Sequence, residues 1–283
     1  MNHARILPYL LLAPATLFLA VFFVAPFIGV AVDAFTGADG SIGLENFRNI
    51  ASDWKFLPAI QNTLVLTLLV VPIQVALALG MANLVMTLRG QRDLVLYVLT
   101  IPLGVSDLVA GVIWLSILDQ SGFLNSALHA FGLIGGPVNI LSYQSPLNLL
   151  VAIVVAEVWR ATAIVLVILV AGMGLIPKEY YEAAEVFGAG PWKRFIKITL
   201  PLLRSSLQTA IILRTILAFE VFAVVMVLAG TNFPVLMSET FNWQFTLQDG
   251  KAAAAYAMVV LVLSVAFTLV VLWGLRDRME ARA

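Results

Sequence analysis

Cysteine is absent from these 283 residues, charged residues are scarce, and only two histidines occur. Without cysteine the chain can form no disulfide, thiolate metal site or thiol nucleophile. His3 and His129 stand far apart in the sequence, so no metal-binding pair is indicated. The formal net charge of zero argues against nucleic acid as a partner, because a phosphate backbone requires a basic face.

Apolar residues dominate what remains: 61% of the chain is hydrophobic, 11% is charged, and the mean hydropathy is +1.01. These values lie outside the range of soluble domains, and they predict an all-α, polytopic protein embedded in the lipid bilayer. A helix needs roughly 20 apolar residues to cross the hydrocarbon core, and six runs reach that length. The predicted spans cover about residues 6–32, 56–88, 94–118, 146–175, 203–229 and 252–275.

Orientation follows from the distribution of Lys and Arg, which favour cytosolic loops. With a cytosolic N-terminus, eleven of the 16 basic residues fall inside and three fall outside, while Arg160 and Arg214 lie within spans. Both termini are therefore predicted to be cytosolic. The first apolar run exceeds the roughly 7–15 residues of a signal-peptide core, so we expect it to be retained. The eleven inside residues are Arg5, Arg89, Arg92, Lys178, Lys193, Arg194, Lys197, Arg204, Arg276, Arg278 and Arg282.

The longest inner loop, residues 177–201, is polar and reads KEYYEAAEVFGAGPWKRFIKITLP from Lys178. Pro177 and Pro191 suit helix starts, and Gly188 suits a helix stop, so the loop is predicted to form two short helices in series. The first carries three Glu residues, and an acidic helix is repelled by an anionic membrane surface. We therefore expect the first helix to bind a protein partner. The alternative is a connector whose alanines only reflect helix propensity.

The spacing of particular residues within this loop supports the expectation of a protein partner. Glu182, Ala183 and Ala184 are followed by Gly188 and then by ITLP ending at Pro201. This pattern resembles the EAA loop of ATP-binding-cassette importer permeases. The likeness extends along nearly the whole chain, through GLENF at 43–47, NT at 62–63 and GFLN at 122–125, and it looks like the carbohydrate-uptake permeases of the maltose and glycerol-phosphate type. One departure is Phe187, where such permeases usually carry Asp.

The resemblance implies a single permease domain over residues 1–283 in a cytoplasmic (inner) membrane importer. Its implied partners are a second permease, two ATP-binding-cassette subunits and an extracytoplasmic solute-binding protein, with a sugar as substrate. Glu182, Ala183, Ala184 and Gly188 would couple the permease to an ATPase, Glu182 as the charged contact. The chain has no phosphate-binding G-x-x-x-x-G-K-[ST] sequence, so ATP and Mg are expected on the partner ATPases and this chain is expected not to be an enzyme.

Ionisable residues within spans are costly, and they are therefore candidates for the substrate pathway. Glu157 and Arg160 are three residues apart on one helix and can pair. We predict a network of Glu157, Arg160, Arg214 and Glu220 between the fourth and fifth spans, which either orders the bundle or binds sugar hydroxyls. Trp159 and Trp114 offer stacking surfaces. The pathway candidates are Asp107, Glu157, Trp159, Arg160, Arg214 and Glu220, with Gln74, Asn83, Asn232 and Trp243 as unranked additions.

Other classes fit less well. A membrane enzyme would show a convergent catalytic or metal-binding set, and the sequence shows none. A secondary transporter fits the spans and the charges in them, but it needs no acidic cytosolic helix. The same importer could instead carry glycerol-phosphate esters, amino sugars or polyols. A phosphate cargo favours a cationic cavity, so the near balance of acidic and basic residues in the spans favours a neutral sugar.

Overall fold

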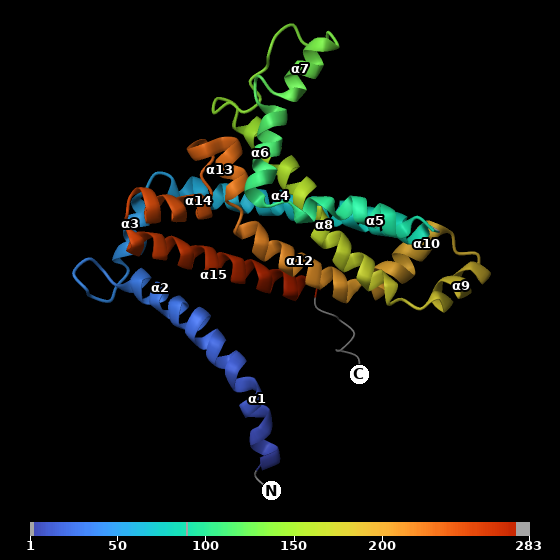
Figure 1. The fold of residues 1–283 in the computed structure, drawn as a ribbon, viewed down its shortest axis with the longest axis horizontal. Coiled ribbons are helices and arrows are strands. Elements are labelled where there is room, and N and C mark those ends of the chain that lie inside the picture. Colours follow the sequence, from blue (N-terminus) through green and yellow to red (C-terminus); the bar gives the residue numbers. More distant parts are fainter. Residues whose placement is uncertain (1–2, 89, 276–283) are drawn as a thin grey trace. The chain divides into compact units, whose positions relative to one another are not determined.

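The computed structural model describes residues 3–88 and 90–275, and it is built from helices (Figure 1). Within that part of the chain no strand forms, and one isolated bridge joins Thr36 to Ile42. The predicted all-α fold is confirmed. Some of the basic residues that carry the orientation prediction lie outside the described residues: Arg89, Arg276, Arg278 and Arg282.

The elements follow one another along the chain, with π-helical or 3₁₀ segments marked η. They are α1 (His3–Leu19), η1 (Ala20–Val24), α2 (Ala25–Phe35), α3 (Glu45–Ser52), α4 (Phe56–Thr87), α5 (Arg92–Thr100), η2 (Ile101–Gly104), α6 (Asp107–Leu118), α7 (Phe123–Ala130), α8 (Pro146–Gly174), α9 (Lys178–Val186), α10 (Pro191–Arg194), η3 (Phe195–Thr199), α11 (Leu200–Leu202), α12 (Arg204–Phe219), α13 (Ala223–Ala229), η4 (Gly230–Asn232), α14 (Leu236–Phe241), η5 (Asn242–Thr246) and α15 (Gly250–Leu275).

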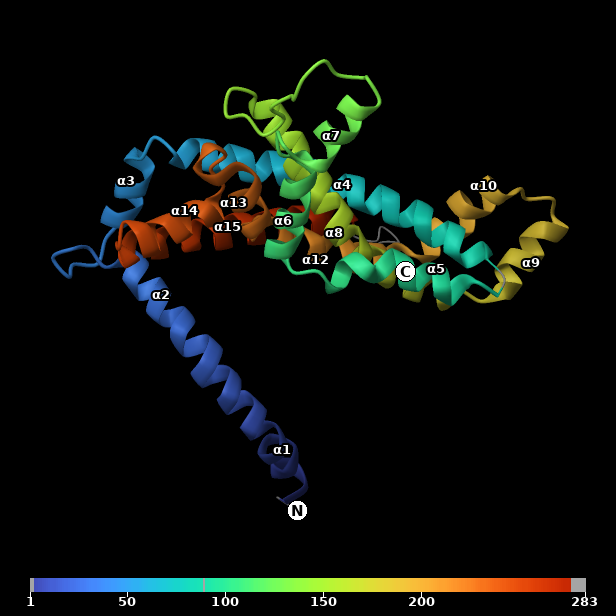
Figure 2. The same ribbon diagram turned by 45° about the horizontal axis from the view of Figure 1, so that its top comes forward.

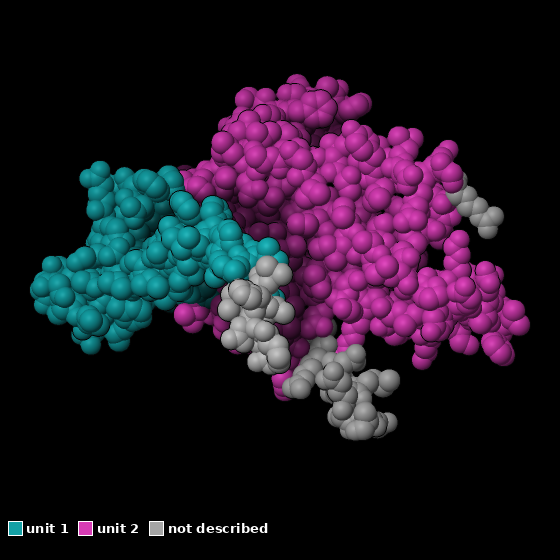
Figure 3. Space-filling view, turned by 60° about the horizontal axis from the view of Figure 1, so that its bottom comes forward, with its two compact units in different colours: residues 1–57, 239–261 teal, residues 58–238, 262–283 magenta. Residues whose placement is uncertain are grey.

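Five helices among the described residues are long and apolar enough to cross a membrane, and counting each of two bent pairs as one span raises the number to seven. Helices α4, α8 and α15 coincide with three predicted spans. The count of six spans stays a prediction. The chain divides into two compact units, residues 1–57 with 239–261 and residues 58–238 with 262–283 (Figure 3). The single permease domain also stays a prediction.

In the first unit, Asn46 of the GLENF stretch holds the end of α2 through its side chain. Its side-chain amide donates to the main-chain carbonyls of Asp33, Ala34 and Thr36 at 3.0 to 3.1 Å. These carbonyls lie at the end of α2, where helical donors run out. Asp33 O also accepts from Thr36 N at 3.2 Å, and Asn46 satisfies the acceptors that remain. The ring of the neighbouring Phe47 lies 5.0 Å from that of Phe35. One short stretch thus fixes how the chain leaves the first apolar helix.

In the second unit, α8 is the central helix. Its N-terminal half packs with α4, α6 and α13 in one apolar cluster that includes Leu149 and Ile153. Its C-terminal half packs with α4 and α12 in another that includes Leu166 and Leu169. More than half of its most apolar stretch is buried, whereas none of the corresponding stretch within Pro8–Phe35 is. Helix α8 therefore holds the unit together.

Two predicted spans are not single helices. The run 94–118 divides into α5, η2 and α6, because Pro102 lacks an amide hydrogen and Ser106 caps a new helix by accepting from Val109 N at 3.3 Å. Asp107 therefore begins a helix, where a negative charge is favourable, and does not interrupt one. The run 203–229 breaks after α12, and Glu220 follows its last turn.

The segment between α13 and α14 is held against α4 by the NT stretch. Asn62 Nδ2 donates to Pro234 O at 2.8 Å, and Leu236 N donates to Thr63 Oγ1 at 3.0 Å. The two joined helical segments are bent by 80°. Because the bend frees main-chain groups that lipid cannot satisfy, these side chains stabilise the bent geometry.

Close packing of α6 on α13 depends on Gly111. A Cβ at this position would lie 2.9 Å from Val227 Cβ and 3.3 Å from Val224 Cα. We expect Gly111→Leu to destabilise the protein by about 2 kcal/mol, since an extra side chain cannot fit a packed crossing. The measurement is the thermal unfolding midpoint of the purified protein. The matched control is Gly29→Leu, because a Cβ at Gly29 of α2 has no neighbour within 4 Å. Equal midpoints for both variants would contradict the packing role.

Candidate functional site

Four helices of the second unit meet at a buried charge network. Glu157 of α8 is its centre, with Oε2 3.1 Å from Arg160 Nη2 on the same helix and 3.0 Å from Arg214 Nη2 on α12. Glu157 is 2% exposed and Arg214 is 1% exposed. Charges so far from solvent persist only when they are paired, and here each carries its counter-ion.

Gln74 of α4 completes the buried part. Its Oε1 accepts from Arg214 Nε at 2.5 Å, and its Nε2 donates to the main-chain carbonyl of Glu157 at 2.8 Å. Both ends of the amide are used, and the side chain is fully buried. Gln74 therefore ties α4 to α8 and α12. The sequence offered it as a polar candidate but gave no reason to rank it above Asn83, which is exposed.

Asp107 forms the outer end of the network. Its Oδ1 lies 2.8 Å from Arg160 Nη1, and its side chain is 47% exposed against 18% for Arg160. The predicted pairing of Glu157 with Arg160 is present. Arg160 thus joins two carboxylates, one buried and one accessible.

The predicted four-residue network is wrong in one member. Glu220 is exposed and makes no hydrogen bond or ion pair with the described residues. It lies just after the last turn of α12, six residues from Arg214, so it does not share that helix face. Asp107 and Gln74 belong to the network, and Glu220 does not.

Two tryptophans, one on α6 and one on α8, contact each other. The rings of Trp114 and Trp159 are 6.2 Å apart in an edge-to-face arrangement. Trp159 is 37% exposed. Among the described residues, the buried Nε1 of Trp114 and the buried Nε of Arg160 have no hydrogen-bond partner. Trp159 therefore presents the accessible aromatic ring of the pair.

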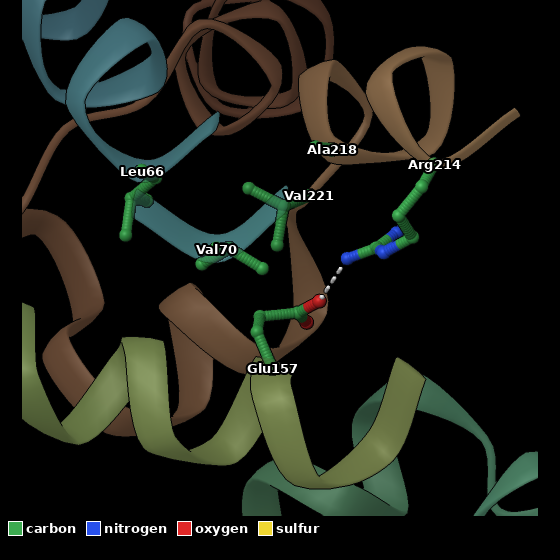
Figure 4. Close-up of a pocket in the computed structure, with 6 residues that line it drawn as sticks. All are labelled: Leu66, Val70, Glu157, Arg214, Ala218 and Val221. Atoms are coloured by element: carbon green, nitrogen blue, oxygen red, sulfur yellow. Dashed lines mark hydrogen bonds and ion pairs between the residues drawn. The ribbon is translucent and has the colours of Figure 1, made fainter. Parts of the chain in front are cut away.

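A small pocket adjoins the Glu157–Arg214 ion pair (Figure 4). The pair forms its polar wall, and the dashed line in Figure 4 marks that contact. Leu66 and Val70 of α4 face the pair across the pocket, with Ala218 and Val221 closing it. The pocket has room for about one water molecule, so it is a packing gap beside the ion pair and is too small to hold a sugar.

The predicted pair of short helices in the loop 177–201 is present, as α9 followed by α10, η3 and α11. Figures 1 and 2 both show α9 and α10 at one end of the second unit. No residue of α9 is buried. Glu182 and Ala183 are exposed, Ala184 is half-buried, and Glu182 makes no contact of the hydrogen-bond or ion-pair type with the described residues. The EAA stretch is free to contact another molecule.

Gly188 ends α9 in a left-handed conformation, with φ of 72°. Its amide donates to Glu185 O, and the amide of Ala189 donates to Ala184 O, both at 2.9 Å. This pair of bonds is the Schellman motif, which strongly favours glycine. No atom lies within 4 Å of a Cβ built at Gly188. Within this chain, backbone geometry and not packing accounts for the glycine.

Two further contacts fix α9 on the segment that follows. Glu185 forms an ion pair with Arg194 of α10. Tyr181 Oη lies 3.1 Å from Thr199 Oγ1, and Thr199 is buried. Because Glu185 is used within the chain, Glu182 and Glu179 are the carboxylates that α9 presents outward.

The sequence missed one buried carboxylate. Glu239 of the first unit is 2% exposed, and its Oε1 lies 3.7 Å from Lys55 Nζ. It belongs to the connection between the predicted spans 203–229 and 252–275. The rings of Phe56 and Trp243 lie 5.6 and 6.3 Å from that of Tyr256, which is also buried. Because Lys55 and Glu239 lie far apart in the sequence, the sequence alone did not indicate that they pair.

Comparison with known proteins identifies the class. Residues 64–278 match the model of the family described as "Binding-protein-dependent transport system inner membrane component". The chain belongs to this family of multi-pass membrane transport subunits. The resemblance that the EAA pattern predicted is thereby confirmed.

Individual relatives cover almost the whole chain. The sulfoquinovosyl glycerol transport system permease protein SmoG of Agrobacterium fabrum is 31% identical over 97% of this chain and 92% of its own. The trehalose/maltose transport system permease protein MalF of Thermococcus litoralis is 31% identical over 94% and 92%. The sn-glycerol-3-phosphate transport system permease protein UgpA of Agrobacterium fabrum is 28% identical over 93% and 92%.

A solved structure shares the fold. A chain of a bacterial ABC transporter involved in the import of the acidic polysaccharide alginate matches with a TM-score of 0.83, covering 97% of this chain and 96% of that one. Its sequence is 23% identical, so the likeness shows the fold alone. The same transporter was also solved with an alginate pentasaccharide-bound periplasmic protein, with a TM-score of 0.82.

The buried pairing generates a prediction. We expect Arg214→Met to lower stability by about 3 kcal/mol, because it leaves buried Glu157 with one counter-ion and Gln74 Oε1 without a donor. Glu220→Gln changes an exposed residue that has no hydrogen-bond or ion-pair partner among the described residues, and it should leave stability within about 0.5 kcal/mol of wild type. Thermal unfolding of the purified protein compares the two. Greater loss in Glu220→Gln would contradict the network.

Proposed function

We propose that this chain is a permease subunit of an ATP-driven importer for a neutral sugar. It forms the translocation pathway with a second permease and is driven by two cytosolic ATP-binding-cassette subunits, which bind ATP and Mg. An extracytoplasmic solute-binding protein delivers the solute. Both chain termini are cytosolic, and helices rock around a site near the membrane midplane.

The observation that carries the proposal is the exposed helix α9. It displays Glu182, Ala183 and Ala184 outward and ends in the turn at Gly188. The chain contains no phosphate-binding loop of its own, so hydrolysis belongs to a partner. Helix α9 is therefore the coupling helix, with Glu182 as its charged contact and the small residues as its close-packing surface.

Charge balance supports a neutral solute. The network holds two guanidinium groups, Arg160 and Arg214, and two carboxylates, Asp107 and Glu157, each within 3.1 Å of an opposite charge. A phosphate or sulfonate would require a cation that is free to receive it. The trehalose/maltose relative favours this cargo class.

A second candidate is a glycerol-phosphate ester or another acidic solute. The resemblance to the sn-glycerol-3-phosphate and sulfoquinovosyl glycerol permeases favours it. The paired state of both arginines argues against it. Amino sugars and polyols remain compatible with the network, because neither adds a buried negative charge. A secondary transporter fits worse, since it has no use for a coupling helix.

The coupling role is tested with the complete importer in liposomes. Glu182→Lys should reduce solute-stimulated ATPase activity at least about tenfold, because a reversed charge in a desolvated contact costs more than about 1.4 kcal/mol. Gly188→Val should do the same by straining the turn that positions α9, since a β-branched residue disfavours positive φ. The readout is phosphate release with and without solute.

Basal ATPase activity and assembly serve as internal controls. The matched variant is Glu185→Gln, which removes a carboxylate of α9 that pairs within the chain and should therefore lose less stimulation than Glu182→Lys. Full stimulation in both Glu182→Lys and Gly188→Val would remove the coupling role.

A further inference from the structure

We infer that Asp107 is a specificity-determining residue, whose carboxylate occupies Arg160 and thereby excludes anionic sugars from the pathway. The inference rests on the proposed function, since it concerns the solute that the same network meets. It assigns a role to the one member of the network that faces accessible space.

The exposure of the network decreases inward. The Asp107 side chain is 47% exposed, that of Arg160 18%, and those of Glu157 and Arg214 2% and 1%. A solute that approaches this cluster therefore meets Asp107 before the buried pair. Asp107 sits in the first turn of α6, after the cap at Ser106, so the helix start holds its position.

Arg160 is the cation that an acidic solute would be expected to bind. Its Nη1 lies 2.8 Å from Asp107 Oδ1, and its Nη2 lies 3.1 Å from Glu157 Oε2. Both terminal nitrogens thus already contact carboxylates. A further carboxylate must displace Asp107 or enter as an unpaired charge where solvent is sparse, and both are unfavourable.

A neutral sugar avoids this conflict. A hydroxyl group carries no charge, and it can donate a hydrogen bond to the exposed Asp107 carboxylate while the ion pair with Arg160 is kept. The Trp159 ring, one residue before Arg160 on α8 and 37% exposed, supplies an apolar surface of the kind that sugar faces pack on. The same carboxylate that accepts from a hydroxyl thus repels a second carboxylate.

Removing the Asp107 charge reverses the preference. In Asp107→Asn, two guanidinium groups face one carboxylate, and Arg160 Nη1 loses its anionic partner. An acidic sugar then restores the balance that Asp107 provided. In Asp107→Glu the carboxylate is kept, so the wild-type preference should be kept.

The experiment uses D-glucose and D-glucuronate, which differ only in the group at C6. Each is titrated into the complete permease–ATPase complex in nanodiscs, and binding is followed by tryptophan fluorescence. The solute-binding protein is left out because it selects among solutes itself, and its selectivity would mask that of the permease. Wild type should prefer glucose, and Asp107→Asn should shift the ratio of the two dissociation constants toward glucuronate by at least about tenfold, the effect of one unscreened charge contact.

The control variant is Asp93→Asn, which removes a carboxylate from the first turn of the nearby helix α5 and should leave the ratio unchanged. An unchanged ratio in Asp107→Asn, or an equal shift in Asp93→Asn, overturns the inference. Should Asp107→Asn fail to assemble, glucuronate binding to wild type as tightly as glucose overturns it as well. Absence of glucose binding to wild type, with glucuronate binding gained in Asp107→Asn, counts against the neutral-sugar proposal and supports the role of Asp107.

Discussion

The need to neutralise charge inside an apolar bundle shapes the second unit. Arg214 and Glu157 are almost without solvent contact, so neither can be placed before the other is in reach. Their pairing fixes α12 against α8, and the amide of Gln74 extends the constraint to α4. Apolar contacts in a lipid environment are poorly selective, because lipid is as apolar as leucine. The polar network therefore supplies directional contacts that determine which helix faces meet.

The same principle extends from side chains to the backbone. The bend between α13 and α14 and the end of α2 leave main-chain groups without helical partners. Asn62, Thr63 and Asn46 satisfy several of them. These polar residues looked like loop composition in the sequence, but they stabilise the interruptions of the helical pattern. Short motifs such as NT and GLENF thus have a physical basis in this chain.

Sequence patterns correctly predicted the features that depend on a single helix. The long apolar runs of α4, α8 and α15, the pairing of Glu157 with Arg160 at a separation of three, and the two helices around Gly188 all follow from local rules. They failed where distant segments meet. No glycine or proline marks the break at residues 220–222, so Glu220 was assigned to a continuous helix. The pairing of Asp107 with Arg160, and of Lys55 with Glu239, joins residues on segments far apart in the sequence, which one sequence without relatives does not reveal.

The length and the close packing of helix α8 have a mechanical consequence. The helix runs without a break from Glu157 to Gly174, 17 steps or about 26 Å at 1.5 Å per residue, and α9 begins four residues later. Tight packing along both halves makes such a helix stiff, so a displacement of its C-terminal end tilts the whole helix instead of bending it. A tilt would strain the salt bridges at the far end, because they span from this helix to α6 and α12. A displacement of α9 can thus reach the buried charges around Glu157 without any local unfolding.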